Sequence, residues 1–592
     1  MPHPNHLIVA SLRNDDSSSR NAGVGVNDHP NVSVTGEGLN RIIYLAWNWT
    51  ISRSTYLELK YDHVQMDYKS GPNISLGYQP AWDSNAMDRM GYFQTAAGYF
   101  IGGATASGQY VGAASETNTQ NFFRDEIKFV LSQYLDFRGH SHLLKAGFAF
   151  DDGGEYLERK ANGWGNIIYY TALSASIDPL RRPGFRARYY PEQAPQDSRG
   201  RTYSLFIQDQ VSIGERLTFI LGVLANRDEF STKTSTGKKT FLTFDFDDEI
   251  QPRLGFTYML DKKAGDKFYG SYGRYKNMDN RSLARAAAPL RVYRSDAYFL
   301  VDGTKLSDLP QASETGKVIL PGLKPTSTDE FVLGYSRPLS KLWSLEIWGQ
   351  VRNVKNVIED YPTVNALTAP SRFVYGNLNG ALKDIDGNVV AGFENVVAKR
   401  EYKALSFELK RQWADRWALT AMYTWSRLYG NWDLDYAPGT SLFYASSYIQ
   451  DAPGLYIQDP LRTGLMSGDR THIFKAFGSF EVYKSLTLGA YFRAQTGRPW
   501  EKRGRDYYGN YYAYLEKAGT RKLDFWANLD LQLSYTVPMG GRFQGIIEAR
   551  IMNAFDNQIV TAVDMRSDQP TFEKATSYVS PRKFALTFYL NF

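Results

Sequence analysis

Two groups of residues have the side chains that bind metal ions. The segment 384–388 (DIDGN) resembles the start of a calcium-binding loop. The following residues, 390–392 (VAG), stand where such a loop needs oxygen ligands, so a turn built from Asx side chains and glycine is the preferred interpretation. His140 and His142 flank a predicted tight turn with no third ligand near them. We therefore predict no metal and no cofactor.

The residues that could carry out covalent catalysis are not spaced as any known catalytic set requires. The chain has no cysteine, which excludes disulfides, thiolate metal ligands and cysteine nucleophiles. No Ser, His and Asp set and no carboxylate pair is spaced as hydrolases need. We predict that the protein is not an enzyme. The 68 basic and 62 acidic residues nearly balance, and no Lys/Arg-rich run appears, so nucleic acid is not a predicted partner.

Aromatic side chains beside polar groups occur in the long predicted loops. Such groups stack on sugar rings or contact a peptide or chelate, but they also pack loops together over a barrel mouth or lie at lipid headgroups. Both interpretations stay open. The candidates for ligand contact are Trp164, Tyr169, Tyr170, Trp432, Tyr436, Tyr507, Tyr508 and Tyr511.

The elements that hold these loops are strands, and the last twelve residues (581–592, PRKFALTFYLNF) show this best. Five apolar residues stand at every second position there, and period-two spacing places them on one face of a strand. A strand with one apolar face and one mixed face suits a wall between lipid and a wet lumen. The five residues are Phe584, Leu586, Phe588, Leu590 and Phe592.

Similar alternating or β-prone segments recur along the chain. They predict seventeen strands, at 41–52, 54–67, 119–136, 139–151, 200–213, 216–226, 249–260, 266–276, 325–338, 341–357, 400–412, 416–428, 470–482, 485–497, 524–537, 542–556 and 581–592. The gaps between them are alternately very short and long. Tight turns at one rim and long loops at the other are typical of outer-membrane barrels, with the turns in the periplasm and the loops outside.

Composition agrees with an all-β membrane protein. Aromatic residues make up 15% of the chain, which favours strands and membrane interfaces. Mean hydropathy is −0.42, and no run approaches the ~18–20 apolar residues of a membrane-spanning helix. We therefore predict a transmembrane antiparallel β-barrel, in which alternation dilutes the apolar signal.

Residues 1–40 are polar and show neither a strand pattern nor a secretory signal. We predict an irregular polar segment that forms part of an extracellular loop, followed by a barrel domain over 41–592. Seventeen strands is an odd number, whereas single-chain bacterial barrels have an even one. We therefore expect the barrel to be incomplete at its N-terminal side.

Several segments resemble a known family in their order and spacing. They are 324–337 (KPTSTDEFVLGYSR), 402–427 (YKALSFELKRQWADRWALTAMYTWSR), 468–477 (GDRTHIFKAF), 492–500 (FRAQTGRPW) and 529–557, which includes LDLQLSYTVPMGG and EARIMNAFDN, with the terminal SPRKFALTFYLNF. Over roughly 41–592 the chain is similar to the C-terminal barrel portion of a TonB-dependent receptor of the outer membrane, and more closely to its Oar-like branch. No single motif is specific.

The resemblance implies a 22-stranded barrel, of which about seventeen strands would be present, without the signal peptide and plug. It implies an integral protein of the bacterial outer membrane, in contact with outer-membrane lipid. It also implies three partners: barrel-assembly machinery that reads the terminal strand as an insertion signal, the TonB complex acting through a plug absent from this chain, and an unknown extracellular ligand.

The function expected from the resemblance is energised uptake of an extracellular nutrient (carbohydrate, peptide or chelate). Two alternatives stay open. The first is a passive outer-membrane barrel, porin-like or an adhesin, which needs no plug. The second is a secreted soluble β-rich carbohydrate-binding protein, which would bury its apolar faces on a second sheet or show fixed repeats. The sequence contains no such repeats.

Overall fold

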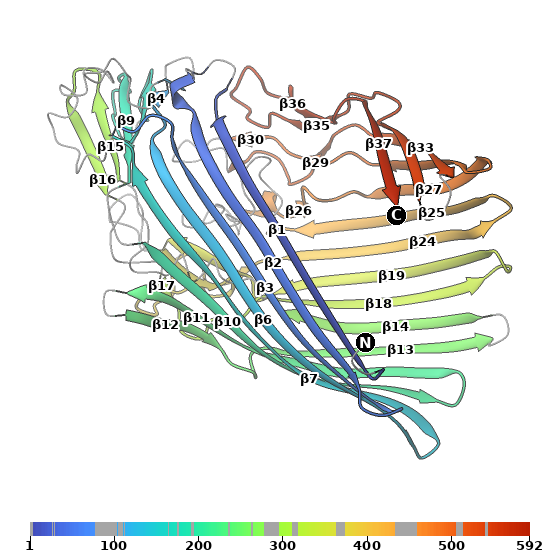
Figure 1. Cartoon of the computed structure of the whole chain (residues 1–592). Coiled ribbons are helices and arrows are strands. Elements are labelled where there is room, and N and C mark those ends of the chain that lie inside the picture. Colours follow the sequence, from blue (N-terminus) through green and yellow to red (C-terminus); the bar gives the residue numbers. More distant parts are fainter. Residues whose placement is uncertain are drawn as a thin grey trace.

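The computed structural model describes residues 4–591 except 26–27, 29, 77–102, 105–109, 112, 164, 175–176, 191–194, 235–236, 262–264, 277–283, 285–294, 311–317, 363–372, 433–458, 505–512 and 539–542. Its main feature is a twenty-stranded sheet whose strand pairs are antiparallel (Figure 1). Two of the twenty, β12 (Gly237–Phe244) and β26 (Gly464–Leu465), are short strands that pair beside β11 and β25.

The other eighteen strands form the wall in chain order, each paired with the next. They are β1 (His6–Ala22), β2 (Val34–Thr50), β3 (Thr55–Pro72), β6 (Glu116–Phe137), β7 (His140–Ala161), β10 (Gln196–Ile213), β11 (Leu217–Thr234), β13 (Ile250–Asp261), β14 (Asp266–Lys276), β18 (Ser327–Pro338), β19 (Trp343–Lys355), β24 (Arg400–Ala414), β25 (Trp417–Gly430), β27 (His472–Tyr483), β28 (Leu486–Gln495), β33 (Trp526–Pro538), β34 (Gln544–Met552) and β37 (Lys583–Asn591).

All seventeen predicted strands are present, and an eighteenth precedes them. The wall thus has one strand more than predicted, and its even count removes the odd number as an argument for missing strands. The prediction of an irregular segment over 1–40 was wrong, because β1 pairs residue by residue with β2, from His6 opposite Trp49 to Ser19 opposite Gly36. The start of β1 is a continuous apolar run, 7–10 (LIVA), without alternation, and a long polar run begins after Leu12. That run has no alternation to detect, and cross-strand hydrogen bonding to β2 holds it extended.

The register divides the wall into an apolar face and a charged face. Phe331 and Leu333 on β18 are 51% and 62% exposed and lie on the apolar face. Glu330, on the other face, accepts a hydrogen bond from Gln350 at 2.7 Å and forms an ion pair with Arg352. A soluble protein would bury the first face, whereas a membrane barrel turns it to lipid and keeps charges in the lumen.

The short connections are tight turns at one end of the wall, here called the turn end. Two-residue turns join β6 to β7 and β24 to β25. Both central residues have positive φ, at 51° and 76° for Arg138 and Gly139 and at 49° and 74° for Asp415 and Arg416. That geometry matches the twist of antiparallel strands, so these hairpins close without a bulky loop.

The long connections lie at the opposite end, here called the loop end, and fold into small sheets of their own. Their strands are β4 (Gly103–Ala104), β5 (Tyr110–Val111), β8 (Asn166–Tyr170), β9 (Gly184–Tyr189), β15 (Ser295–Leu300), β16 (Lys305–Pro310), β17 (Val318–Ile319), β20 (Ile358–Pro362), β21 (Phe373–Asn377), β22 (Asn379–Gly380), β23 (Val396–Val397), β29 (Pro499–Trp500), β30 (Arg503–Gly504), β31 (Ala513–Tyr514), β32 (Arg521–Lys522), β35 (Val560–Val563) and β36 (Ala575–Tyr578). Two 3-10 turns, η1 (Pro30–Val32) and η3 (Pro460–Arg462), complete the described elements.

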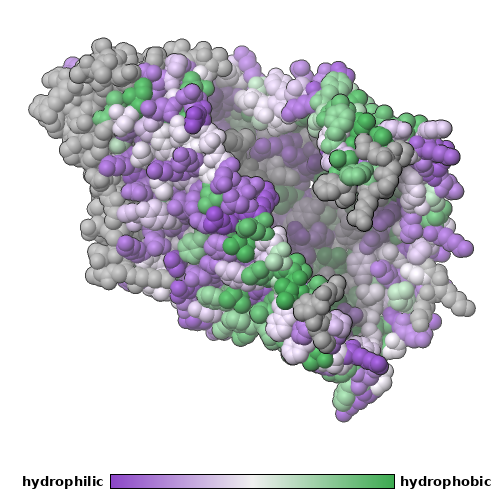
Figure 2. All heavy atoms as spheres, viewed as in Figure 1, coloured by the Kyte–Doolittle hydropathy of each residue, from purple (hydrophilic) through white to green (hydrophobic). Residues whose placement is uncertain are grey.

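The sheet curves round but has two edges. Within the described residues, β1 pairs only with β2 and β37 only with β34. Figure 2 shows a recess between the two edges, with hydrophobic surface along the lower part of β1 and near the C-terminal strands. The described part of the chain contains no helix with the length and apolar character to cross a membrane.

Candidate functional site

The loop end presents a folded layer rather than separate loops. Strands from three connections, far apart in sequence, form one six-stranded sheet in the order β16-β15-β9-β8-β4-β5. Phe185 on β9 and Phe299 on β15 are fully buried and stand opposite each other in register. Burial of such aromatics fixes the loops to one another, because each ring removes a large apolar area from water.

A second hydrophobic cluster ties the connection after β19 to the connection after β25. Val357, Tyr361, Val374 and Trp432 are among its buried members. The Tyr361 hydroxyl donates a hydrogen bond to the carbonyl of Lys383 at 3.0 Å. This cluster gives the loop end a core of its own.

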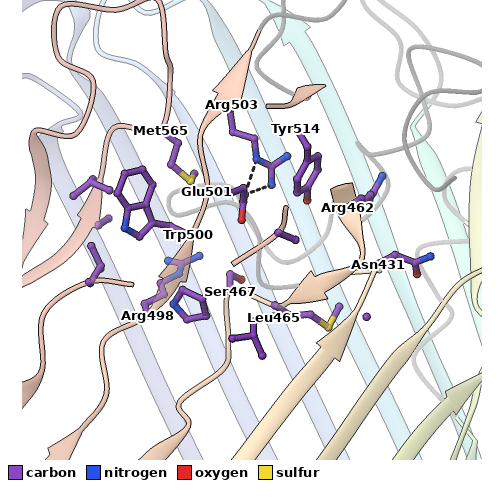
Figure 3. Close-up of a pocket in the computed structure, with 17 residues that line it drawn as sticks. Asn431, Arg462, Leu465, Ser467, Arg498, Trp500, Glu501, Arg503, Tyr514 and Met565 are labelled. Atoms are coloured by element: carbon purple, nitrogen blue, oxygen red, sulfur yellow. Dashed lines mark hydrogen bonds and ion pairs between the residues drawn. The ribbon is translucent and has the colours of Figure 1, made fainter. Parts of the chain in front are cut away.

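A small pocket lies among the C-terminal loops, and Figure 3 shows the residues that line it. Glu501 and Arg503 are both buried at its centre, with an Oε1 to Nη2 distance of 2.5 Å. The Arg503 guanidinium lies 3.5 Å from the ring centroid of Tyr514. The second carboxylate oxygen of Glu501 accepts a hydrogen bond from the Gly519 amide at 3.1 Å.

The pocket is too small to hold a nutrient. Its volume is about 40 Å³, whereas small-molecule sites usually have ~300–1,000 Å³. A cavity of this size with polar walls suits one or a few water molecules. The Glu501–Arg503 pair therefore serves to hold strands β29 to β32 in place.

A neighbouring turn in the connection between β34 and β37 is fixed by Asp564. Its carboxylate accepts hydrogen bonds from Arg566, at 2.7 and 2.8 Å, and from the Thr571 hydroxyl at 2.5 Å. These donors hold the pKa of Asp564 well below its usual range. The backbone of Arg503 bonds to Met565, so this turn and the pocket form one unit.

The structure separates the predicted ligand contacts into several groups. Trp432 is 7% exposed and donates from its indole nitrogen to Glu359 at 3.4 Å, so it packs the loops instead of facing a ligand. Tyr170 is half-buried on β8, and the Arg186 guanidinium lies 5.9 Å from its ring centroid. The backbone of Tyr169 is in β8. The remaining candidates lie outside the described residues: Trp164, Tyr436, Tyr507, Tyr508 and Tyr511.

The terminal strand has the predicted alternation. Phe584, Leu586, Phe588 and Leu590 share one face, with Phe584 73% exposed, and the first of them stands opposite Ile551 on β34. Phe592 lies outside the described residues. The role of this strand as an insertion signal stays a prediction.

Sequence reasoning missed the buried pair Glu501 and Arg503. Their i, i+2 spacing is common on strand faces and carries no signal for burial. The one available hint was the Trp500 that precedes them, because aromatic and charged residues together at a loop end indicate a packed loop. For Asp384 the predicted Asx turn is confirmed, since its Oδ1 accepts the amides of Asp386 and Asn388 at 2.9 and 2.8 Å.

Comparison with known proteins agrees with this fold. Residues 9–554 match the family described as TonB dependent receptor-like, beta-barrel. The TonB-dependent transporter Oar of Myxococcus xanthus is 24% identical over 464 residues, which are 69% of this chain and 41% of the relative. The chain thus spans less than half the length of that relative.

Two solved structures show the same architecture. The outer membrane transporter YddB from Escherichia coli has a TM-score of 0.61 and 14% identity, covering 99% of this chain and 66% of its own. The pyoverdine receptor FpvA from Pseudomonas aeruginosa, bound to pyoverdine, has a TM-score of 0.55 and 13% identity, covering 98% and 67%. The chain belongs to the TonB-dependent receptor β-barrel family, whose members are integral outer-membrane receptors and transporters. Its turn end is therefore periplasmic and its loop end extracellular.

Proposed function

We propose that this chain is the barrel of a receptor that binds an extracellular nutrient (a carbohydrate, a peptide or a chelate) for uptake energised through TonB. The observation that supports it most is the folded loop layer, because three connections share one sheet at the extracellular end. A passive pore needs no such joint surface. Loops that function together in binding commonly rest on a rigid scaffold.

The proposal includes a plug, formed by residues other than 1–592, on which TonB acts. It also includes further strands that close the wall between β1 and β37. Unpaired backbone groups at a sheet edge cost several kcal/mol each in lipid, so both edges require partners there. The solved relatives are longer than this chain, which gives room for such segments.

Energised uptake has a direct test. Cells that produce the complete receptor would be given one labelled oligosaccharide, one labelled peptide and one labelled ferric chelate. We expect uptake of one class, and we expect it to stop both with a protonophore and in a strain without TonB. Uptake that continues under both conditions would contradict the proposal and support the passive barrel.

A conductance measurement distinguishes the energised receptor from the passive barrel independently of uptake. A passive, porin-like barrel reconstituted in a planar bilayer conducts ions as it is. The complete receptor should stay closed, and removal of its plug should open it. Steady conductance of the complete protein would remove the receptor proposal.

A further inference from the structure

A group of polar side chains is buried on the lumen face where β11 changes partner. Ala225 on β11 stands opposite Ile250 on β13, but Asp228 stands opposite Phe244 on β12. Glu249 lies in the turn that joins β12 to β13. Its backbone carbonyl accepts a hydrogen bond from the backbone amide of Asn226 at 3.4 Å. The wall therefore brings Asn226, Asp228 and Glu249 to one place.

These three side chains are fully buried, at 0% exposure each. Both carboxylate oxygens of Glu249, both side-chain amide atoms of Asn226 and Oδ2 of Asp228 lack a well-formed hydrogen bond. The Glu249 carboxylate nevertheless lies close enough to the side chains of Asp228 and Asn226 to interact with both. Only Oδ1 of Asp228 is satisfied, by the Thr202 hydroxyl at 2.6 Å. Buried carboxylates that face each other without a donor are rare in folded proteins, so a proton or a cation must lie between Asp228 and Glu249.

The surroundings do not neutralise the two carboxylates. Asp151, on β7, which is separated from β11 by β10, adds a further negative charge that acts on Asp228. The positive charge of Lys276 lowers the pKa of Glu249, but less than burial raises it. The guanidinium of Arg253 is stacked on Tyr275, 3.9 Å from the ring centroid. Burial, with the charge of Asp228, raises the pKa of Glu249 to about 8. Two ionised carboxylates here are costly, so the pair either holds a proton or binds a cation that favours both charged forms.

The ligand chemistry points to calcium. Every available acceptor atom is an oxygen, from two carboxylates, one amide and one hydroxyl. With only two carboxylates, the site is not a group of three or more His, Cys, Asp or Glu, and the described residues hold no group of that kind that could bind a metal. Hard oxygen ligands select Ca²⁺ or Mg²⁺ over softer metals. Mg²⁺ loses water reluctantly, whereas Ca²⁺ accepts irregular protein cages, which suits a dehydrated site.

We propose that Asp228, Glu249 and Asn226, assisted by Thr202, bind one Ca²⁺ ion that fixes the β11–β12–β13 junction at the extracellular end. The ion would coordinate the oxygen atoms of all three side chains, and the Asn226 Nδ2 donor would stay directed at the Glu249 carboxylate. It joins β10, β11 and the turn before β13, and so it stiffens the wall below the loop layer.

The test uses the full chain folded in detergent, treated with EDTA and then titrated with CaCl₂ alone by calorimetry. We expect one bound Ca²⁺ and a rise in the thermal midpoint that EDTA reverses. Asp228→Asn and Glu249→Gln should each lower Ca²⁺ affinity at least about tenfold, because the charge count of the ligands sets affinity. Heat-modifiable migration on gels confirms that each variant is folded.

The matched control is Asp384→Asn, which removes a half-buried carboxylate whose hydrogen bonds are made within its own turn. It should bind Ca²⁺ as the parent chain does. The proposal is overturned if the parent binds no Ca²⁺, or if Glu249→Gln binds it unchanged. It is also overturned if Glu249→Gln stabilises the metal-free chain and Ca²⁺ does nothing, because that result shows a shared proton.

Discussion

The guanidinium of Arg503 lies between the carboxylate of Glu501, at 2.5 Å, and the ring of Tyr514, 3.5 Å from its centroid. Removal of one partner from a buried ion pair leaves an uncompensated charge, at a cost of about 3–5 kcal/mol. We expect Glu501→Ala to loosen the C-terminal loops while the barrel wall stays folded. Limited proteolysis of intact cells would show new cleavage within 496–525.

Arg13→Ala is the matched control, because its ion pair with Asp15 is exposed on both sides. Exposed pairs contribute ~0–1 kcal/mol, so protease resistance should not change. Equal cleavage of the Glu501→Ala and Arg13→Ala variants would show that the buried Glu501–Arg503 pair does not stabilise the C-terminal loops.

A new positive charge should destabilise the protein on the apolar face of β18 and have little effect on the lumen face of β19. Leu333→Lys places an ammonium on the apolar face, where lipid makes it cost up to ~2–4 kcal/mol near the bilayer midplane. We expect a lower midpoint in urea unfolding from lipid vesicles. Gln350→Lys places it in the lumen beside Glu330, and it should be close to neutral. The reverse order would mean that the faces are assigned wrongly.

Acid should weaken the turn that Asp564 fixes. Its pKa is lowered in the folded state, so its contribution to stability is present above the unfolded value of about 3.9 and is lost as pH falls through the lower folded value. Asp564→Asn should remove this contribution at neutral pH, at ~1.5–3 kcal/mol for hydrogen bonds to a charged group. Hydrogen exchange of the amides in 559–580 would measure both effects.

The absence of cysteine allows closure of the wall to be tested by cross-linking. Ala10→Cys with Leu45→Cys joins β1 to β2, where the two residues are register partners, and should form a disulfide. Pairs that join β1 to β37, such as Ser11→Cys with Thr587→Cys, should stay reduced. An efficient β1–β37 disulfide would show that the eighteen strands close by themselves.

The sequence by itself determined the wall of this protein. In each of seventeen segments, β-prone residues or period-two alternation predicted a strand, because lipid on one side and water on the other leave no other stable pattern. The alternating gap lengths then fixed which end carries the loops. β1 was missed because its polar half faces water on both sides, so only pairing with β2 reveals it.

Only the tertiary structure decided the loop end and the buried polar groups. Phe185 and Phe299 meet through a sheet built from separate connections, and no local pattern records such a contact. Sequence alone does not distinguish a buried Trp432 from one that is exposed to a ligand, and only the tertiary structure places it in a hydrophobic cluster. Glu249 and Asp228 are 21 positions apart and ordinary in sequence, and their lack of well-formed hydrogen bonds at Glu249 and at Oδ2 of Asp228 arises only where β11 exchanges β13 for β12.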